Sequence, residues 1–427
     1  MKFWHMQLHP TGDSIDRNGV MDVLRKGVVG MGDRWDNDGG QPRRFSDEAQ
    51  IGDVIMIRNN GPVALVEITS DIRENDDQGL WFKIARSVRL LDVEGEEWRK
   101  NYLSEVGKVW TDNLYLPSTF QSADKSEFVA YWHSKLRERI MVNKLVALLK
   151  SNKNLILTGA PGTGKTYLAR QVAKAITSVL DITANKPDAK SDNIAFIQFH
   201  PSYDYSDFVE GLKPDLVNGH ISFKVKAGVF KDFCKRARSD ETQNYVFIID
   251  EINRADLSRV FGELLFALED SYRGHPVETQ YAYLQMPKED FFIPNNLYVI
   301  GTMNDIDRSV ESIDFALRRR FAWKEIDAEY SQIIVDQSPL TSEWKFVAKK
   351  RMNALNNEIE TIFGSKAFQI GGAYFKKLEH YATSESSFDE GFEKLWTNHI
   401  EILLQEYLRG MSDAAMQLQK MKQAYAC

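Results

Sequence analysis

Cysteine and long apolar runs are scarce in this chain of 427 residues. The two cysteines, Cys234 and Cys427, cannot build a disulfide framework, which predicts a reducing compartment. No apolar run approaches the roughly 18 residues that a membrane-spanning helix requires. The first ten residues also lack the long apolar core of a secretory signal peptide. These absences predict a cytoplasmic protein without a membrane partner.

An excess of basic residues is absent as well. The formal net charge is −7, so the chain has no global field that would attract nucleic acid. The composition is 43% hydrophobic and 27% charged, which is the ordinary balance of globular domains. The length is sufficient for two or three such domains.

The most informative stretch that is present begins at Asn154. Leu155–Leu157 is a short apolar run that predicts a buried strand, and a helical pattern covers Tyr167–Ile176. Between them, Gly159–Thr166 fits the phosphate-loop pattern G-x-x-x-x-G-K-[ST]. Glycines let such a loop turn its N–H groups toward phosphate oxygens, and the helix N-terminus adds partial positive charge. Lysine reaches the β- and γ-phosphates, and threonine ligates Mg²⁺. The predicted nucleotide-binding residues are Gly159, Pro161, Gly162, Thr163, Gly164, Lys165 and Thr166.

Acidic and amide side chains follow two later strands. Tyr245–Asp250 predicts a buried strand, and Asp250 is expected to hold the Mg²⁺ shell together with Thr166. Glu251 is expected to polarise the attacking water. The strand that begins at Leu297 leads to Asn304, which is expected to orient that water. Two carboxylates at the exit of a buried strand are costly without a cation or a partner, so the pair supports a metal-dependent site.

A cluster of arginines ends a segment that we expect to be helical, Asp314–Phe321. Arg319 and Arg320 are predicted to reach the γ-phosphate of a neighbouring subunit. The alternative is a solvated basic helix end that complements the helix dipole. The preceding motifs favour the catalytic interpretation.

Patterning divides the chain into four parts. Short β-like runs and turns in residues 1–110 predict a small, β-rich, barrel-like domain, and residues 111–125 predict a linker. Residues 126–328, which open with a helix up to Lys150, predict an α/β domain with a parallel sheet. Residues 329–427 predict a helical lid. We also expect a helix over Leu257–Asp270, an amphipathic helix over Phe392–Leu408, and a β-hairpin that turns at Asn218–Gly219.

The N-terminal region resembles the PUA/EVE-like fold. The resemblance rests on Phe3-Trp4-His5, Gly32–Asp36 and Ile51–Val54. It implies a pocket in which aromatic side chains stack on a modified base flipped out of duplex DNA. The candidate pocket residues are Trp4, His5, Trp35 and Trp81. They can equally be core residues of a small domain, and acidic residues outnumber basic ones in residues 1–110.

Residues 125–427 resemble the AAA+ motors of the McrB family, the GTPase subunits of modification-dependent restriction systems. The matching segments are Gly159–Thr166, Ser202–Pro214, Ile249–Ala255, Gly301–Asn304 with Asp307–Ser309, Leu317–Phe321 and Ile370–Phe375. The resemblance implies GTP as substrate, Mg²⁺, a ring that is expected to be a hexamer, and a role for Asp307. The family's Asn-Thr-Ala-Asp is here Asn304-Asp-Ile-Asp307, and its Ile-Gly-His-Ser-Tyr-Phe is Ile370-Gly-Gly-Ala-Tyr-Phe375.

No convincing nuclease constellation of paired acids with a lysine is found in the sequence. We therefore expect a separate, McrC-like nuclease subunit to cut DNA, driven by this chain after it recognises duplex DNA with a modified base. The alternative is an ATP-dependent AAA+ remodeller whose N-terminal domain binds protein or RNA. The fold alone does not separate the two.

Overall fold

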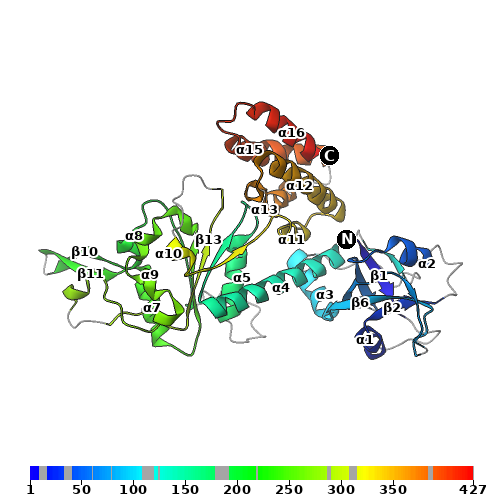
Figure 1. Ribbon diagram of the computed structural model, residues 1–427, viewed down its shortest axis with the longest axis horizontal. Helices are drawn as coiled ribbons and strands as arrows, with labels where there is room; N and C mark the ends of the chain where they lie inside the picture. The colour runs from blue at the N-terminus through cyan, green and yellow to red at the C-terminus, as the bar shows by residue number, and fades with distance from the viewer. Residues whose placement is uncertain are drawn as a thin grey trace. The chain divides into compact units, whose positions relative to one another are not determined.

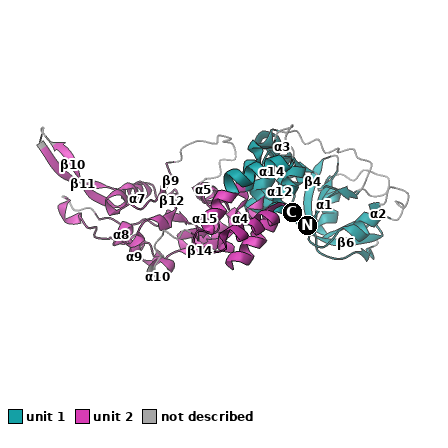
Figure 2. Cartoon of the chain, turned by 90° about the horizontal axis from the view of Figure 1, so that it is seen from above, with its two compact units in different colours: residues 1–139, 333–351, 375–400 teal, residues 140–332, 352–374, 401–427 magenta. Residues whose placement is uncertain are grey.

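A computed structural model describes most of the chain. The described residues are 1–8, 17–32, 41–59, 61–77, 79–107, 120–123, 126–177, 192–217, 220–285, 290–306, 315–382 and 388–426. They fall into two compact units (Figure 2). Unit 1 contains residues 1–139, 333–351 and 375–400, and unit 2 contains residues 140–332, 352–374 and 401–427.

Unit 1 is built on a seven-stranded sheet with the order β2-β6-β4-β3-β1-β7, in which β5 also pairs with β6. The β1–β3 pair is parallel and all the other pairs are antiparallel. This confirms the expected β-rich N-terminal region. The strands are β1 Phe3–Gln7, β2 Val28–Met31, β3 Val54–Arg58, β4 Pro62–Ile68, β5 Arg73–Glu74, β6 Ile84–Asp92 and β7 Phe120–Ser122.

The central strands β3 and β4 are buried on both faces. Alternate residues point to opposite sides of a sheet, so each of these strands contributes side chains to two hydrophobic cores. One side packs Ile55, Ile57 and Val66 with helix α1, Arg17–Arg25. The other packs alternating residues such as Met56 against α3, Gly95–Val106, and against the start of α4, Glu127–Asn152.

Asp92 anchors the start of α4 to this sheet. Its carboxylate accepts hydrogen bonds from the indole nitrogens of Trp98 at 2.6 Å and Trp132 at 2.8 Å, and from Arg139 at 2.9 Å. Burial alone would raise the pKa of Asp92, but these three donors hold it below its usual value. The first half of α4 therefore belongs with the N-terminal sheet. Strand β7 lies within the expected linker, so the last residues of that segment also join the sheet.

Unit 2 contains a five-stranded sheet with the order β14-β8-β13-β12-β9, in which every pairing is parallel. This confirms the predicted α/β architecture, with α5, Lys165–Thr177, packed on the sheet (Figure 1). The carboxyl ends of parallel strands meet at one edge, so the ends of β8, β13 and β12 lie side by side. The strands are β8 Asn154–Thr158, β9 Ile194–Gln198, β12 Tyr245–Asp250, β13 Leu297–Thr302 and β14 Ala322–Glu325.

The expected β-hairpin is confirmed. Strands β10, Glu210–Val217, and β11, His220–Ala227, pair antiparallel and project from the rest of unit 2 (Figures 1 and 2). The expected turn, Asn218–Gly219, lies outside the described residues. The hairpin leads into α7, Val229–Ser239.

Two helices expected from the sequence are interrupted. Residues 257–270 form α8, Leu257–Phe261, and α9, Leu264–Ala267, because Gly262 between them has a φ of 52° with a ψ of −130°. Residues 392–408 pass from α14, Phe388–Leu395, through a π-helical turn into α15, Glu401–Tyr407. Apolar periodicity survives such breaks, so it did not reveal them.

The C-terminal part is helical, as expected for a lid. Its other helices are α11 Gln332–Asp336, α12 Ser342–Phe363, α13 Gly372–Lys376 and α16 Ala414–Ala426. Residues on α12 and beyond contribute to both units. None of the described helices is long and apolar enough to cross a membrane.

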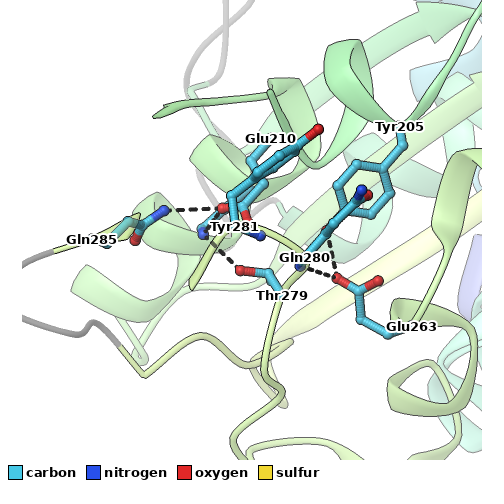
Figure 3. A network of polar contacts seen from close by, with 8 residues as sticks. Tyr205, Glu210, Glu263, Thr279, Gln280, Tyr281 and Gln285 are labelled. Carbon is cyan, nitrogen blue, oxygen red and sulfur yellow. Dashed lines mark hydrogen bonds and ion pairs between the residues drawn. The ribbon is translucent and has the colours of Figure 1, made fainter. Parts of the chain in front are cut away.

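A buried ion pair joins the base of the hairpin to α7, and Figure 3 shows the polar network around its carboxylate, Glu210. The side chains of Lys231 and Glu210 are 2% and 0% exposed, and they pair directly. Glu210 also accepts hydrogen bonds from the Tyr281 N–H at 2.9 Å and from Gln285 at 3.1 Å. The carboxylate thus ties a strand, a helix and the segment 279–285 together. Burial would raise the pKa of Glu210, and its donors lower it below its ordinary value.

Replacing Lys231 by methionine is expected to destabilise unit 2 by about 3–5 kcal/mol, because it leaves the Glu210 carboxylate buried without its countercharge. Urea unfolding of the full chain measures the loss. Lys235→Met is the matched control, since Lys235 is exposed on the same helix and its loss should cost under about 0.5 kcal/mol. Equal stability of the two variants would show that the pair contributes little.

Candidate functional site

The phosphate loop has the backbone that its sequence predicts. Gly159, Gly162 and Gly164 have φ values of 136°, 77° and 89°, which side chains with a Cβ rarely adopt. At Gly159 space is limiting too, because a Cβ there would lie 2.3 Å from the Ile326 carbonyl oxygen. The loop therefore requires glycine for both conformation and close approach.

Lys165 is folded into this loop. Its ammonium donates to the carbonyl oxygens of Gly159 at 3.0 Å and Ala160 at 2.8 Å. Burial lowers the pKa of Lys165 to about 8, although the nearby acids Asp305 and Glu251 act in the opposite direction. A bound polyanion would favour the charged ammonium and replace these carbonyl partners.

Asp250, at the end of β12, contacts the other predicted metal ligand, Thr166. Its Oδ1 accepts hydrogen bonds from Thr166 at 2.7 Å and from Thr302 at 2.6 Å. Carboxylate and hydroxyl oxygens are ligands that Mg²⁺ takes in nucleotide sites. The two residues predicted to hold the metal are thus in direct contact, and they fit the ion. Thr302 was missed by the sequence analysis, although its place at the end of β13 was a usable signal.

Glu251 and Asn304 also meet at this edge of the sheet. Asn304 donates from its side-chain amide to Glu251 Oε1 at 3.0 Å, and Arg254 lies 3.4 Å from Oε2. Glu251 has a φ of 52°, an uncommon left-handed conformation for a residue with a Cβ. Such conformations concentrate at functional sites, where surrounding contacts hold them. Asp307 lies outside the described residues.

The two predicted arginines are placed differently. Both contact the carboxylate of Glu269, Arg319 at 3.0 Å and Arg320 at 2.9 Å. The side chain of Arg320 is 9% exposed, whereas that of Arg319 is 68% exposed. Helix α10 covers only Phe315–Arg318, so both arginines follow it in a turn. Of the two arginines, the exposed Arg319 is the better placed to contact a neighbouring molecule.

The N-terminal pocket residues are corrected in part. Trp4 is 1% exposed, stacks on Phe120, and donates its indole N–H to Asp53 at 3.0 Å, so it is a core residue. His5 is 4% exposed on the same strand and is likewise in the interior. Neither presents a free ring face to a base, because packing in the sheet occupies them. Trp81 is half-buried at the edge of the core, and Trp35 lies outside the described residues.

Family models match the part of the chain that contains the phosphate loop and the helical part that follows it. Residues 154–321 match the AAA domain of the dynein-related subfamily, and residues 347–415 match the alpha-helical lid domain of McrB. These segments form an McrB-type AAA+ module. Its sheet, phosphate loop and lid are those described above.

Two curated relatives resemble this chain over about half of its length. The chain is 38% identical over 242 residues to the Type IV methyl-directed restriction enzyme EcoKMcrB subunit of Escherichia coli K12, covering 55% of this chain and 50% of that protein. It is 27% identical over 234 residues to the Type II restriction enzyme BsuMI component YdiS of Bacillus subtilis 168, covering 47% of this chain and 65% of that protein. The chain thus matches about half of the first relative's length.

Proposed function

We propose that this chain is a GTP-hydrolysing AAA+ motor and the DNA-recognition subunit of a modification-dependent restriction system. The observation that carries the proposal is the contact set at the sheet edge, in which Thr166 meets Asp250 and Asn304 meets Glu251 beside the phosphate loop. These groups can hold Mg²⁺ and an attacking water against a γ-phosphate. When bound, the metal would neutralise developing phosphate charge.

The choice of GTP rests on the resemblance of residues 303–309 to the corresponding segment of the McrB family. The alternative is an ATP-dependent remodeller. Initial rates with GTP and ATP at matched concentrations in the presence of Mg²⁺ test this choice. We expect faster hydrolysis of GTP, and Lys165→Ala should abolish hydrolysis of both nucleotides. Equal or faster ATP hydrolysis would favour the remodeller.

The further parts of the proposal are a hexameric ring, cytoplasmic location, and an McrC-like nuclease partner. A separate nuclease is needed because no constellation of paired acids with a lysine was found in the sequence. Co-purification of the chain with a nuclease encoded beside it tests the partnership.

The N-terminal sheet is proposed to read the modified base, with Trp81 as the remaining described aromatic candidate. Arg58 is 1% exposed, so it does not contribute to a phosphate-binding face, whereas Arg43 is exposed. The full chain should bind methylated or hydroxymethylated duplexes more tightly than unmodified duplex. Stacking is worth about 1–3 kcal/mol per base, so Trp81→Ala should remove most of this difference. If the wild-type chain bound unmodified duplex as tightly as the modified duplexes, or more tightly, the assignment would be wrong.

A further inference from the structure

A segment of the lid lies directly against the phosphate loop within unit 2. The Gly371 N–H donates to the Pro161 carbonyl at 2.9 Å, and the Ala373 N–H donates to the Gly162 carbonyl at 3.0 Å. A Cβ at Gly371 would lie 2.2 Å from the backbone carbon and oxygen of Gly162. The two backbones therefore touch, and only glycine fits between them.

These two hydrogen bonds determine how the loop's amides are turned. In a trans peptide the carbonyl and the N–H point in opposite directions. The carbonyl of Pro161 shares its peptide plane with the N–H of Gly162, and the carbonyl of Gly162 shares its plane with the N–H of Thr163. Holding both carbonyls toward the lid therefore turns both N–H groups away from it, as a phosphate-binding loop requires.

The lid segment is itself held by side chains. Asn356 on α12 brackets Ile370, donating to its carbonyl at 3.0 Å and accepting from its N–H at 2.7 Å. Ser331 accepts from the Gly372 N–H at 2.8 Å. Asn356 and Ser331 are 5% and 0% exposed, so loss of either would leave buried backbone groups without partners. A displacement of α12 would be transmitted through Asn356 to Ile370 and on to the loop.

We propose that residues 370–373, held by Asn356 and Ser331, are a positioning element that orients the Gly162 and Thr163 amides for the nucleotide's phosphates. The proposal rests on the proposed nucleotide-binding function. It gives a route by which nucleotide and lid communicate, because phosphates that bind these amides favour the lid arrangement that holds the two carbonyls, and the reverse holds by linkage.

The test compares Asn356→Ala with Asn357→Ala in the full chain, since Asn357 is the exposed neighbour on the same helix. The phosphates gain these amide bonds in the ground state and the transition state alike, so KM for GTP should rise about tenfold in Asn356→Ala with kcat within about twofold. Gly371→Ala, which forces the segments apart, should behave like Asn356→Ala. Asn357→Ala should match wild type.

Hydrogen exchange without nucleotide provides a second readout. Amides of residues 371–373 should exchange slowly in wild type and at least tenfold faster in Asn356→Ala, with the sheet amides of β12 unchanged. Fast exchange of 371–373 in wild type would overturn the contact, and unchanged KM in both Asn356→Ala and Gly371→Ala would overturn its positioning role. A wild-type chain that neither binds nor hydrolyses GTP or ATP would instead overturn the proposed function, whatever the exchange result.

Discussion

Replacing Glu251 by glutamine is expected to lower the rate of nucleotide hydrolysis by roughly 10²- to 10⁴-fold, the usual contribution of a general base. Glutamine keeps the shape and the oxygen that accepts from Asn304, so the contact at 3.0 Å can persist. It lacks the negative charge that polarises water. Binding of GTP and Mg²⁺ should therefore remain, because Lys165, Thr166 and Asp250 are untouched.

Single-turnover hydrolysis, measured beside equilibrium binding of a fluorescent GTP analogue, separates the two effects. Glu241→Gln is a suitable control, since Glu241 is exposed and lies after α7. Hydrolysis by Glu251→Gln at the wild-type rate would remove Glu251 from its assigned role. Loss of binding together with turnover would mean that Glu251 acts on the structure of the loop.

The second large effect is expected at Arg319. An arginine supplied by a neighbouring subunit is worth roughly 10³–10⁵ in rate, and its planar guanidinium suits the charge of a transferring phosphoryl group. Arg319→Ala should therefore be nearly inactive, as should Lys165→Ala. A mixture of the two chains should regain activity, because some interfaces then combine an intact loop with an intact arginine.

Arg320→Ala is the informative companion variant. Its side chain is 9% exposed and pairs with Glu269, so its loss should lower stability more than the loss of the exposed Arg319. Thermal unfolding without nucleotide measures this difference. If the mixed chains assemble together and recover no activity, Arg319 acts within its own subunit or only through Glu269.

Local sequence signals were sufficient for the nucleotide site. Strand, glycine loop and helix are consecutive in the chain, so the geometry of Gly159–Thr166 follows from φ preferences and apolar runs. Asp250 and Glu251 could be predicted because two acids at the end of a buried strand are costly unless a cation or a polar partner meets them. The family resemblance to McrB-type motors is confirmed by the family-model matches.

The burial of individual side chains depends on packing between distant segments, so the sequence did not predict it. Trp4 and Trp81 are both aromatic residues of the N-terminal region, and the sequence does not distinguish their environments. In the structure, pairing of β1 with its neighbours buries Trp4, whereas Trp81 is only partly buried at the edge of the same core. Arg319 and Arg320 are adjacent in sequence. Only the tertiary structure, through the turn after α10 and the position of Glu269, leaves the side chain of Arg319 68% exposed and that of Arg320 9% exposed.

The same limit applies to the lid. The sequence identifies Ile370–Phe375 as a motif but gives it no role. Gly162 and Gly371 are 209 residues apart in the chain, and no local signal shows that their backbones touch. Sequence periodicity records which face of an element is apolar, but not which distant backbone that face meets. In this chain the chemistry of the nucleotide site is local and was readable, whereas its coupling to the lid arises from tertiary contacts between segments that the chain keeps far apart.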